Sequence, residues 1–332
     1  MIGHRSVKLL SRAIFSLLQA SPPGQSWELV LVVNGSDPGV QEWASELLHS
    51  NRVPMSVVQV SERRPGAARN AGVSASRAPL LFFLDDDIEC FQDIVGAALD
   101  LFRDQGLDVA GGANLTPPGS GTLERATGGV MASWFGAASM RRRYRVSREG
   151  FEDEHGLILC NLAVRKSLFL AQKGFASQMI SNEENVLLQR LAASGARLWT
   201  SPRLAVFHRR RATWAGLCSQ AAKYGAGRAQ NLLLVPQSWK PLYLAPPLFF
   251  LYLILLPLLL RIEPRSVALA PLGLYSMFAL LLSMARALVE RDPAQLAGMA
   301  VYPCVHFSYG LGFARTILGW VGRREELREH TA

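Results

Sequence analysis

Three adjacent aspartates, Asp85, Asp86 and Asp87, directly follow the apolar run Leu80–Leu84. The run has the length of a buried strand, so the carboxylates fall at the carboxyl end of a strand, where open α/β sheets bind ligands. Because side chains alternate along a strand, Asp85 and Asp87 point the same way and can share one hard divalent ion, Mg²⁺ or Mn²⁺. Alternatively, the acids favour the start of a helix expected over Cys90–Arg103. The run alone leaves both interpretations open.

The elements that must position these aspartates alternate between helix and strand. Before the aspartates, apolar spacing predicts helices over Val7–Leu18, Val40–Leu48 and Ala67–Ser76 and strands over Glu28–Val33 and Met55–Val60. After them, it predicts strands over Asp108–Gly111, Leu157–Val164 and Arg197–Phe207 and helices over Glu183–Ala193 and Trp214–Leu234. Such alternation is typical of an α/β fold in which helices cover both faces of a mostly parallel sheet.

The last third of the chain contains long apolar stretches. Leu242–Leu260 carries no charge, and Val267–Val289 is interrupted by a single arginine. Because about 20 apolar residues cross a bilayer, both stretches are expected to be membrane helices. A third stretch, Leu296–Trp320, contains His306 and Arg315, and it is expected to span, to re-enter or to lie in the membrane interface.

The chain of 332 residues has a formal net charge of +9, with arginine clusters at Arg141–Arg143 and Arg209–Arg211. No zinc-finger, RRM or helix-turn-helix pattern accompanies this charge, which argues against nucleic acid as a partner. Positive segments beside membrane helices favour the cytoplasmic side and contact with anionic lipid or phosphate. The cysteines are far apart in sequence, so neither a zinc site nor a disulfide framework is expected. They are Cys90, Cys160, Cys218 and Cys304.

Four separated segments occur in a distinctive order. They are VVNGSDPG at residues 32–39, RRPGAARNAGVSASRAPLLFFLDDDIE at 63–89, LCNLAVRKSLFLAQKGF at 159–175 and EENVLLQRLAASGARL at 183–198. In this order they resemble the family 2 glycosyltransferases, which have the GT-A nucleotide-sugar-binding fold. A motif in its expected context is far more specific than one alone. The resemblance implies a Rossmann-like mixed α/β sheet over roughly residues 5 to 210.

The resemblance implies a metal and nucleotide site around the aspartates. Asp85 and Asp87 occupy the positions of the family's D-x-D motif, with Asp87 as the direct ligand and Asp85 nearer the ribose or the metal shell. His208 occupies the place of a further metal ligand, although a lone histidine is more often structural. Arg69 either contacts the nucleotide or pairs with a structural carboxylate. The residues expected to bind the nucleotide sugar are Asn34, Ser36, Arg69, Asn70, Asp85 and Asp86.

The resemblance also implies a catalytic carboxylate pair. Glu184 occupies the position of the family's general base, normally an aspartate, and Glu183 precedes it. A positioned carboxylate would take the proton of an acceptor hydroxyl as it attacks the anomeric carbon, and a single displacement would invert that carbon. The alternative is that the two acids only favour the start of a helix. The residues expected to bind the acceptor are Asn161, Gln220, Lys223 and Tyr224, and Tyr224 is equally well explained as an interfacial aromatic residue.

Two later segments narrow the resemblance and one early feature departs from it. QAAKYGAGR at residues 220–228 and HFSYGLGFARTILGW at 306–320 are similar to the membrane-anchored, succinoglycan or exopolysaccharide-type branch of the family. The first strand of the family is apparently lacking, because Met1 stands almost where that strand would end. The chain is therefore expected either to start further upstream or to form an incomplete sheet with compromised activity.

Together these features predict four regions. They are a GT-A domain over residues 1–210, an amphipathic linker helix over 211–240, a membrane region of two or three helices over 241–321 and a charged tail over 322–332. The expected protein is a multi-pass enzyme of the inner or plasma membrane with a cytoplasmic catalytic domain. It would transfer sugar from a nucleotide-diphosphate sugar to a lipid-linked or growing polysaccharide acceptor. The alternatives are a catalytically impaired scaffold of a polysaccharide assembly complex and a nucleotidyltransferase.

Overall fold

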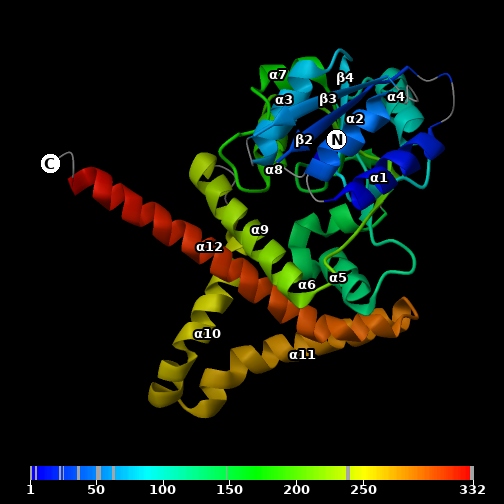
Figure 1. Cartoon of the computed structure of the whole chain (residues 1–332). Helices are drawn as coiled ribbons and strands as arrows, with labels where there is room; N and C mark the ends of the chain where they lie inside the picture. The colour runs from blue at the N-terminus through cyan, green and yellow to red at the C-terminus, as the bar shows by residue number, and fades with distance from the viewer. Residues whose placement is uncertain are drawn as a thin grey trace. The chain divides into compact units, whose positions relative to one another are not determined.

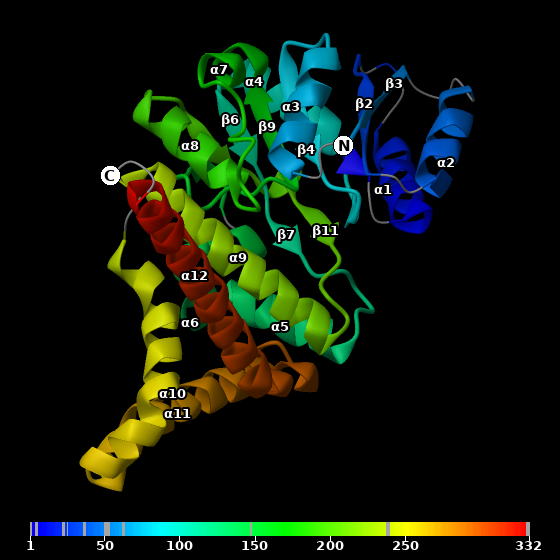
Figure 2. The ribbon, with the colours of Figure 1, turned by 60° about the vertical axis from the view of Figure 1, so that its left-hand side comes forward.

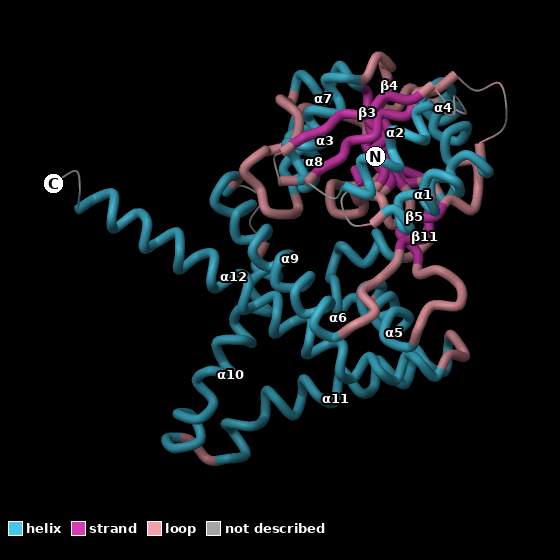
Figure 3. The backbone as a smooth tube through the Cα atoms, viewed as in Figure 1, coloured by secondary structure: helices cyan, strands magenta, loops and turns pink. Residues whose placement is uncertain are grey.

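The computed structural model describes residues 2–329 except 4–5, 22–23, 25, 36–37, 50–53, 62–63, 147 and 237–239. The chain forms two compact units, of which the first comprises Met1–Pro118 and Ser139–Arg209 and the second Gly119–Ala138 and Arg210–Ala332. Figure 1 traces the elements of each unit along the chain. All described strands belong to the first unit, where Figure 3 shows them among the helices.

The N-terminal sheet of the first unit is parallel and has the order β1-β2-β3. Its strands are β1 (Ile2–Gly3), β2 (Leu29–Asn34) and β3 (Met55–Val60), and its helices are α1 (Val7–Ala20), α2 (Pro38–His49) and α3 (Pro65–Ala75). Side chains of β2 alternate between the two faces. Leu29, Leu31 and Val33 pack with α1 and α2, whereas Val32 packs with Ala68 of α3.

β1 corrects the expectation that the first strand is lacking. Ile2 and Gly3 pair with Val32 and Val33 of β2, so a two-residue strand stands before α1. This short strand reaches only the end of β2, and the sheet of β2 is separate from the sheet that contains β4 (Leu80–Leu84). A cavity of about 310 Å³ is lined by residues of β2, α3 and β4 and by residues of α4 (Ile94–Asp104).

The second sheet is mixed, and the expectation of a mostly parallel sheet is wrong for this part of the fold. Its order is β4-β9-β6-β10-β8, with β9 antiparallel to both β4 and β6. A small third sheet has the order β5-β11-β7. The remaining strands are β5 (Ile88–Glu89), β6 (Val109–Gly111), β7 (Asn114–Leu115), β8 (Gly150–Phe151), β9 (Asn161–Arg165), β10 (Leu198–Thr200) and β11 (Val206–His208). Phe83 of β4 packs in the core with Phe169 and Phe175.

Several predicted elements have different bounds; for example, the strand expected over Leu157–Val164 is β9, Asn161–Arg165. For two of them the structure gives the reason. The strand expected over Arg197–Phe207 is broken by the 3₁₀ helix η2 (Pro202–Leu204), because proline donates no ladder hydrogen bond and Ser201 caps the turn. The helix expected from Cys90 begins at Ile94, where the Asp93 carboxylate accepts from the Gly96 backbone N–H at 2.9 Å. Asp93 rather than the aspartate cluster therefore caps α4.

The second unit is helical. Its helices are α5 (Thr122–Ala132), α6 (Trp134–Ala137), α9 (Trp214–Leu234), α10 (Ala245–Ile262), α11 (Arg265–Val289) and α12 (Gly298–Glu329). Figure 2 shows α9 and α12 side by side. A Cβ at Gly225 would lie 2.0 Å from the Tyr309 carbonyl oxygen, and a Cβ at Gly312 would lie 2.0 Å from that of Ala222. Only glycine permits such a close approach of two helix backbones.

Two helices of the second unit are long and apolar enough to cross a bilayer. They cover Pro241–Ile262 and Arg265–Val289, and 18-residue windows within them have mean hydropathies of 2.1 and 1.9. Most of their side chains are not buried within the protein, and exposed leucines such as Leu248 and Leu274 lie on them. Within the part of the chain that the structure describes, the third predicted stretch, Leu296–Trp320, does not form a helix that is apolar enough over its length to cross a bilayer.

Candidate active site

A carboxylate–imidazole cluster lies at the carboxyl end of β4. One ligand atom from each of Asp85, Asp87 and His208 lies within 4.8 Å of the others. His208 Nε2 is 3.0 Å from Asp87 Oδ1 and 4.0 Å from Asp85 Oδ2. Asp87 and His208 are buried, whereas Asp85 is partly exposed. This donor set fits a divalent cation, and its carboxylate oxygens suit Mg²⁺ and Mn²⁺.

Strand pairing brings His208 to the aspartates. β11 runs antiparallel to β5, so that His208 lies opposite Ile88, the residue after Asp87. The Arg209 backbone N–H donates to the Asp87 carbonyl oxygen at 3.2 Å and extends this pairing. The structure therefore brings together the three residues that the sequence analysis assigned to a metal.

Arg69 joins the aspartate cluster to the paired glutamates. Its Nη2 donates to Asp85 Oδ1 at 2.6 Å and its Nη1 to Glu183 Oε1 at 2.5 Å. The Arg69 side chain is 9% exposed. Burial alone would lower the pKa of Arg69, but the Asp85 and Glu183 carboxylates outweigh burial and raise it. Of the two roles expected for Arg69, pairing with carboxylates is the one that these contacts display.

The glutamate pair opens helix α8 (Glu183–Ala193). Both side chains are buried, directly after Asn182, whose backbone is left-handed at φ 62°. Burial raises the pKa of Glu183 to about 7, and the Arg69 guanidinium opposes that rise. Glu184 Oε1 accepts from Arg143 Nη1 at 3.2 Å. The two acids therefore have separate cationic partners in addition to their favourable place at a helix start.

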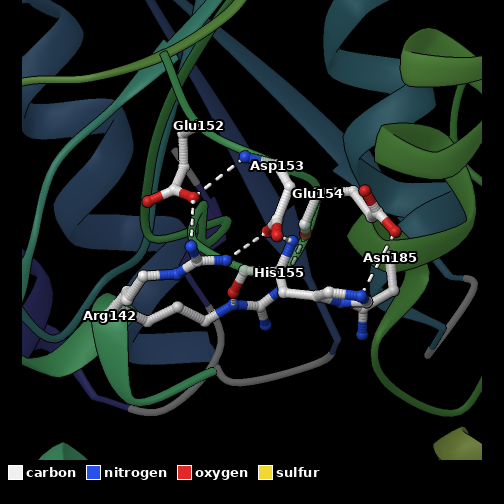
Figure 4. A network of polar contacts seen from close by, with 7 residues as sticks. Arg142, Glu152, Asp153, Glu154, His155 and Asn185 are labelled. Atoms are coloured by element: carbon white, nitrogen blue, oxygen red, sulfur yellow. Dashed lines mark hydrogen bonds and ion pairs between the residues drawn. The ribbon is translucent and has the colours of Figure 1, made fainter. Parts of the chain in front are cut away.

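Arg143 is a component of the site that sequence reasoning missed. It lies in the 3₁₀ helix η1 (Ala138–Tyr144), inside a Gly/Arg-rich segment whose pattern indicates no regular element. The only signal was the run Arg141–Arg143, which we assigned to lipid or phosphate. Arg142 and Arg143 instead pair with protein carboxylates. Figure 4 shows the contacts of Arg142 with Glu152 and Asp153.

Other predicted site residues have contacts within the first unit. Asn34 ends β2 and is buried, and Asp86 is buried beside the cluster. The Asn70 amide donates to the Phe175 carbonyl oxygen at 2.9 Å and accepts from the Phe175 N–H at 3.0 Å. Asn161 is fully buried, and its Nδ2 donates to the Leu204 carbonyl oxygen at 2.7 Å. The amides of Asn70 and Asn161 thus hold protein backbone in place.

The remaining predicted residues lie elsewhere. Ser36 is outside the described residues. Gln220, Lys223 and Tyr224 lie on α9 of the second unit, where Gln220 Nε2 donates to the Tyr224 hydroxyl at 3.1 Å. Residues four apart on a helix lie on one face, so Gln220 and Tyr224 form a single polar patch.

We expect Arg69→Met to destabilise the protein strongly. The substitution leaves the buried Glu183 carboxylate without its cation, and breaking a buried pair in this way costs roughly 3–5 kcal/mol. Urea or thermal unfolding of the purified protein, followed by circular dichroism, measures the loss. The matched control is Arg12→Met, because Arg12 pairs with Glu89 at the surface and such pairs contribute about 0–1 kcal/mol. Equal unfolding midpoints for both variants would show that the Arg69 bridge carries no special stability.

Comparisons with known proteins agree with this geometry. The family model described as Glycosyl transferase family 2 matches residues 3–171. Glycosyltransferase AglE of Haloferax volcanii is 25% identical over 120 residues. That match covers 36% of this chain and 40% of the relative, so the chain spans less than half the length of the curated relative it matches.

Solved structures show the same fold. The mannosyltransferase PcManGT from Pyrobaculum calidifontis, in complex with GDP-Man and Mn²⁺, matches with a TM-score of 0.60 at 14% identity. The match covers 92% of this chain and 84% of that one. S. aureus TarS 1–349, in complex with UDP-GlcNAc, matches with a TM-score of 0.50 at 12% identity, over 96% of this chain and 90% of that one. The fold is accordingly a mixed α/β, GT-A-like fold, and with a family match over half its length the chain belongs to glycosyl transferase family 2.

Proposed function

We propose that the protein is a metal-dependent, inverting glycosyltransferase that uses a nucleotide-diphosphate sugar. The observation that carries the proposal is the continuous charged site of the first unit. The candidate metal ligands Asp85, Asp87 and His208 are connected to the paired glutamates, because Arg69 contacts both Asp85 and Glu183. The site therefore combines a place for a diphosphate-bound metal with a carboxylate for proton transfer.

The nucleotide-sugar donor is proposed to bind at the cluster of Asp85, Asp87 and His208. Asp85, Asp87 and His208 would hold Mg²⁺ or Mn²⁺, which supplies Lewis-acid neutralisation of the leaving diphosphate. The structural neighbours support this assignment, because PcManGT is described with GDP-Man and Mn²⁺ and TarS with UDP-GlcNAc. Asn34 and Asp86, which are buried near the strand ends, are proposed to complete the nucleotide-sugar pocket.

Glu184 is proposed to activate the acceptor. Its carboxylate would take the proton of an acceptor hydroxyl while the oxygen forms a bond to the anomeric carbon and the bond to the diphosphate breaks. A single displacement of this kind inverts the anomeric configuration. Both acids contact an arginine, and we assign Glu184 as the base because it occupies the position of the family's general base.

The proposed setting is the inner or plasma membrane. The helices Pro241–Ile262 and Arg265–Val289 support two spans, which return the chain to its original side. We place the catalytic unit in the cytoplasm and assign a lipid-linked or growing glycan of an exopolysaccharide-type pathway as acceptor. Gln220, Lys223 and Tyr224 are the proposed acceptor contacts of the second unit.

A nucleotide panel tests this function. We expect at least one of UDP, GDP and dTDP to raise the thermal unfolding midpoint of the full chain in Mn²⁺, and EDTA to abolish the rise. A nucleotide at 100 times its Kd stabilises a protein by about 2.7 kcal/mol, which is readily measured. The matching sugar nucleotide should then release nucleoside diphosphate when membrane acceptors are supplied. No metal-dependent binding in the whole panel would favour the scaffold alternative, and released pyrophosphate would indicate a nucleotidyltransferase.

A further inference from the structure

We propose that Arg143 is a positioning residue that fixes the Glu184 carboxylate against the turn of residues 152–155. The inference rests on the proposed function, because it takes Glu184 to be the general base. It adds a residue from the Gly/Arg-rich segment to the site and explains why that segment carries a buried cation.

The guanidinium of Arg143 holds two parts of the first unit at once. On the helix side, Nη1 donates to Glu184 Oε1 at 3.2 Å and Nη2 to Asn185 Oδ1 at 2.7 Å. On the turn side, Nε donates to the His155 carbonyl oxygen at 2.7 Å and Nη2 to that of Glu154 at 3.2 Å. The planar fork of arginine therefore ties the start of α8 to the turn in one geometry.

The contacts of the Arg143 guanidinium with protein groups indicate positioning rather than direct contact with substrate. The Arg143 side chain is 4% exposed and that of Glu184 is 8% exposed. The guanidinium is enclosed by its protein partners, so it acts on the reaction through Glu184. Among the described contacts it meets Oε1 of that carboxylate, which leaves Oε2 to receive the acceptor proton.

The adjacent Arg142 provides a matched control. Arg142 holds the same turn through Glu152 Oε1 at 3.2 Å and Asp153 Oδ1 at 2.6 Å. Figure 4 shows these contacts on the opposite side of the turn from Asn185. Among the described residues, the carboxylates that Arg142 contacts belong to the turn, whereas Arg143 contacts Glu184. A substitution at Arg142 therefore disturbs the turn but leaves the contact between Arg143 and Glu184 intact.

The experiment compares Arg143→Gln, Arg143→Lys and Arg142→Gln in the full chain. Misplacement of a reacting group by about 1 Å can lower a rate about 100-fold, and we expect that loss in kcat for Arg143→Gln. The KM and Kd of the donor should stay within about two-fold, because the metal and nucleotide contacts are elsewhere. Arg143→Lys should have a kcat about ten-fold higher than Arg143→Gln, because lysine restores the positive charge but not the planar guanidinium. The kcat of Arg142→Gln should stay within about three-fold of the wild-type value.

Hydrogen exchange of the same proteins gives a readout that does not require activity. We expect faster exchange of amides in residues 154–156 and in the first turn of α8 for Arg143→Gln. Equal kcat losses at Arg142 and Arg143, or a loss of donor affinity that parallels kcat, would overturn the positioning role. If the wild-type chain transfers no sugar, the proposed function fails. In that case, unchanged hydrogen exchange near Glu184 in Arg143→Gln would overturn the Arg143 inference as well. Faster exchange there would support the role of Arg143 in fixing the Glu184 carboxylate against the turn.

Discussion

Asp87→Ala is expected to abolish metal-dependent sugar transfer, with a loss of at least about 1,000-fold in kcat/KM. Asp87 is more buried than Asp85, the other candidate carboxylate ligand, and lies 3.0 Å from His208 Nε2, so its removal takes away the central oxygen donor. A Lewis acid on a leaving phosphate contributes several kcal/mol to the transition state, and each 1.36 kcal/mol is a factor of about ten in rate. The loss of turnover is measured by the release of nucleoside diphosphate. The loss of metal affinity is measured by titration with Mn²⁺ monitored by electron paramagnetic resonance.

The control for this substitution is Asp100→Ala. Asp100 also pairs with a cation, Arg203 at 2.7 Å, but both side chains are more than 40% exposed. We expect this variant to keep wild-type metal affinity and turnover, because exposed pairs contribute little to stability. Full Mn²⁺ affinity in Asp87→Ala would exclude Asp87 as a ligand and would remove the main support for metal dependence.

Glu184→Gln is expected to lower kcat by about 100- to 10,000-fold while donor binding is retained. Glutamine keeps the size of the side chain and can still contact Arg143, but it cannot take a proton from the acceptor. Steady-state transfer gives kcat, and calorimetric titration with the nucleotide in Mn²⁺ gives the donor affinity. Loss of turnover with intact affinity separates proton transfer from donor binding.

Two further glutamates make the test specific. Glu154→Gln serves as the control, because Glu154 pairs with His155 at the partly exposed turn and is expected to leave kcat unchanged. Glu183→Gln is expected mainly to lower stability, since it removes a carboxylate that Arg69 contacts. Wild-type turnover in Glu184→Gln would refute the base assignment, and Glu183 would become the next candidate.

Local sequence patterns predicted the elements that carry the site. The helix ranges Glu183–Ala193 and Trp214–Leu234 and the strand ranges Met55–Val60 and Leu80–Leu84 agree with the structure residue for residue. Hydrophobic spacing and capping are properties of neighbouring residues, so they can be read along the chain. The order of the four motifs likewise predicted the family, which the match over residues 3–171 confirmed.

Strand pairing was predicted less well. The direction of β9 between β4 and β6 depends on long connections, and apolar content alone does not distinguish parallel from antiparallel neighbours. The two-residue strand Ile2–Gly3 was missed for a related reason, because its backbone hydrogen-bond partners lie on the distant strand β2. The break at Pro202 differs, because its causes, the proline and the Ser201 cap, are local and can be read from the sequence.

The sequence by itself determined the types of the reactive groups: a D-x-D pair at a strand end, two acids at a helix start and a histidine after a late strand. Only the tertiary structure decided which charges meet. Arg69 contacts Glu183 across 114 positions, and Arg143 contacts Glu184 across 41. Such pairs form because buried charges must be compensated, and the compensating partner is whichever one the packed backbone brings within reach. No local spacing specifies that partner.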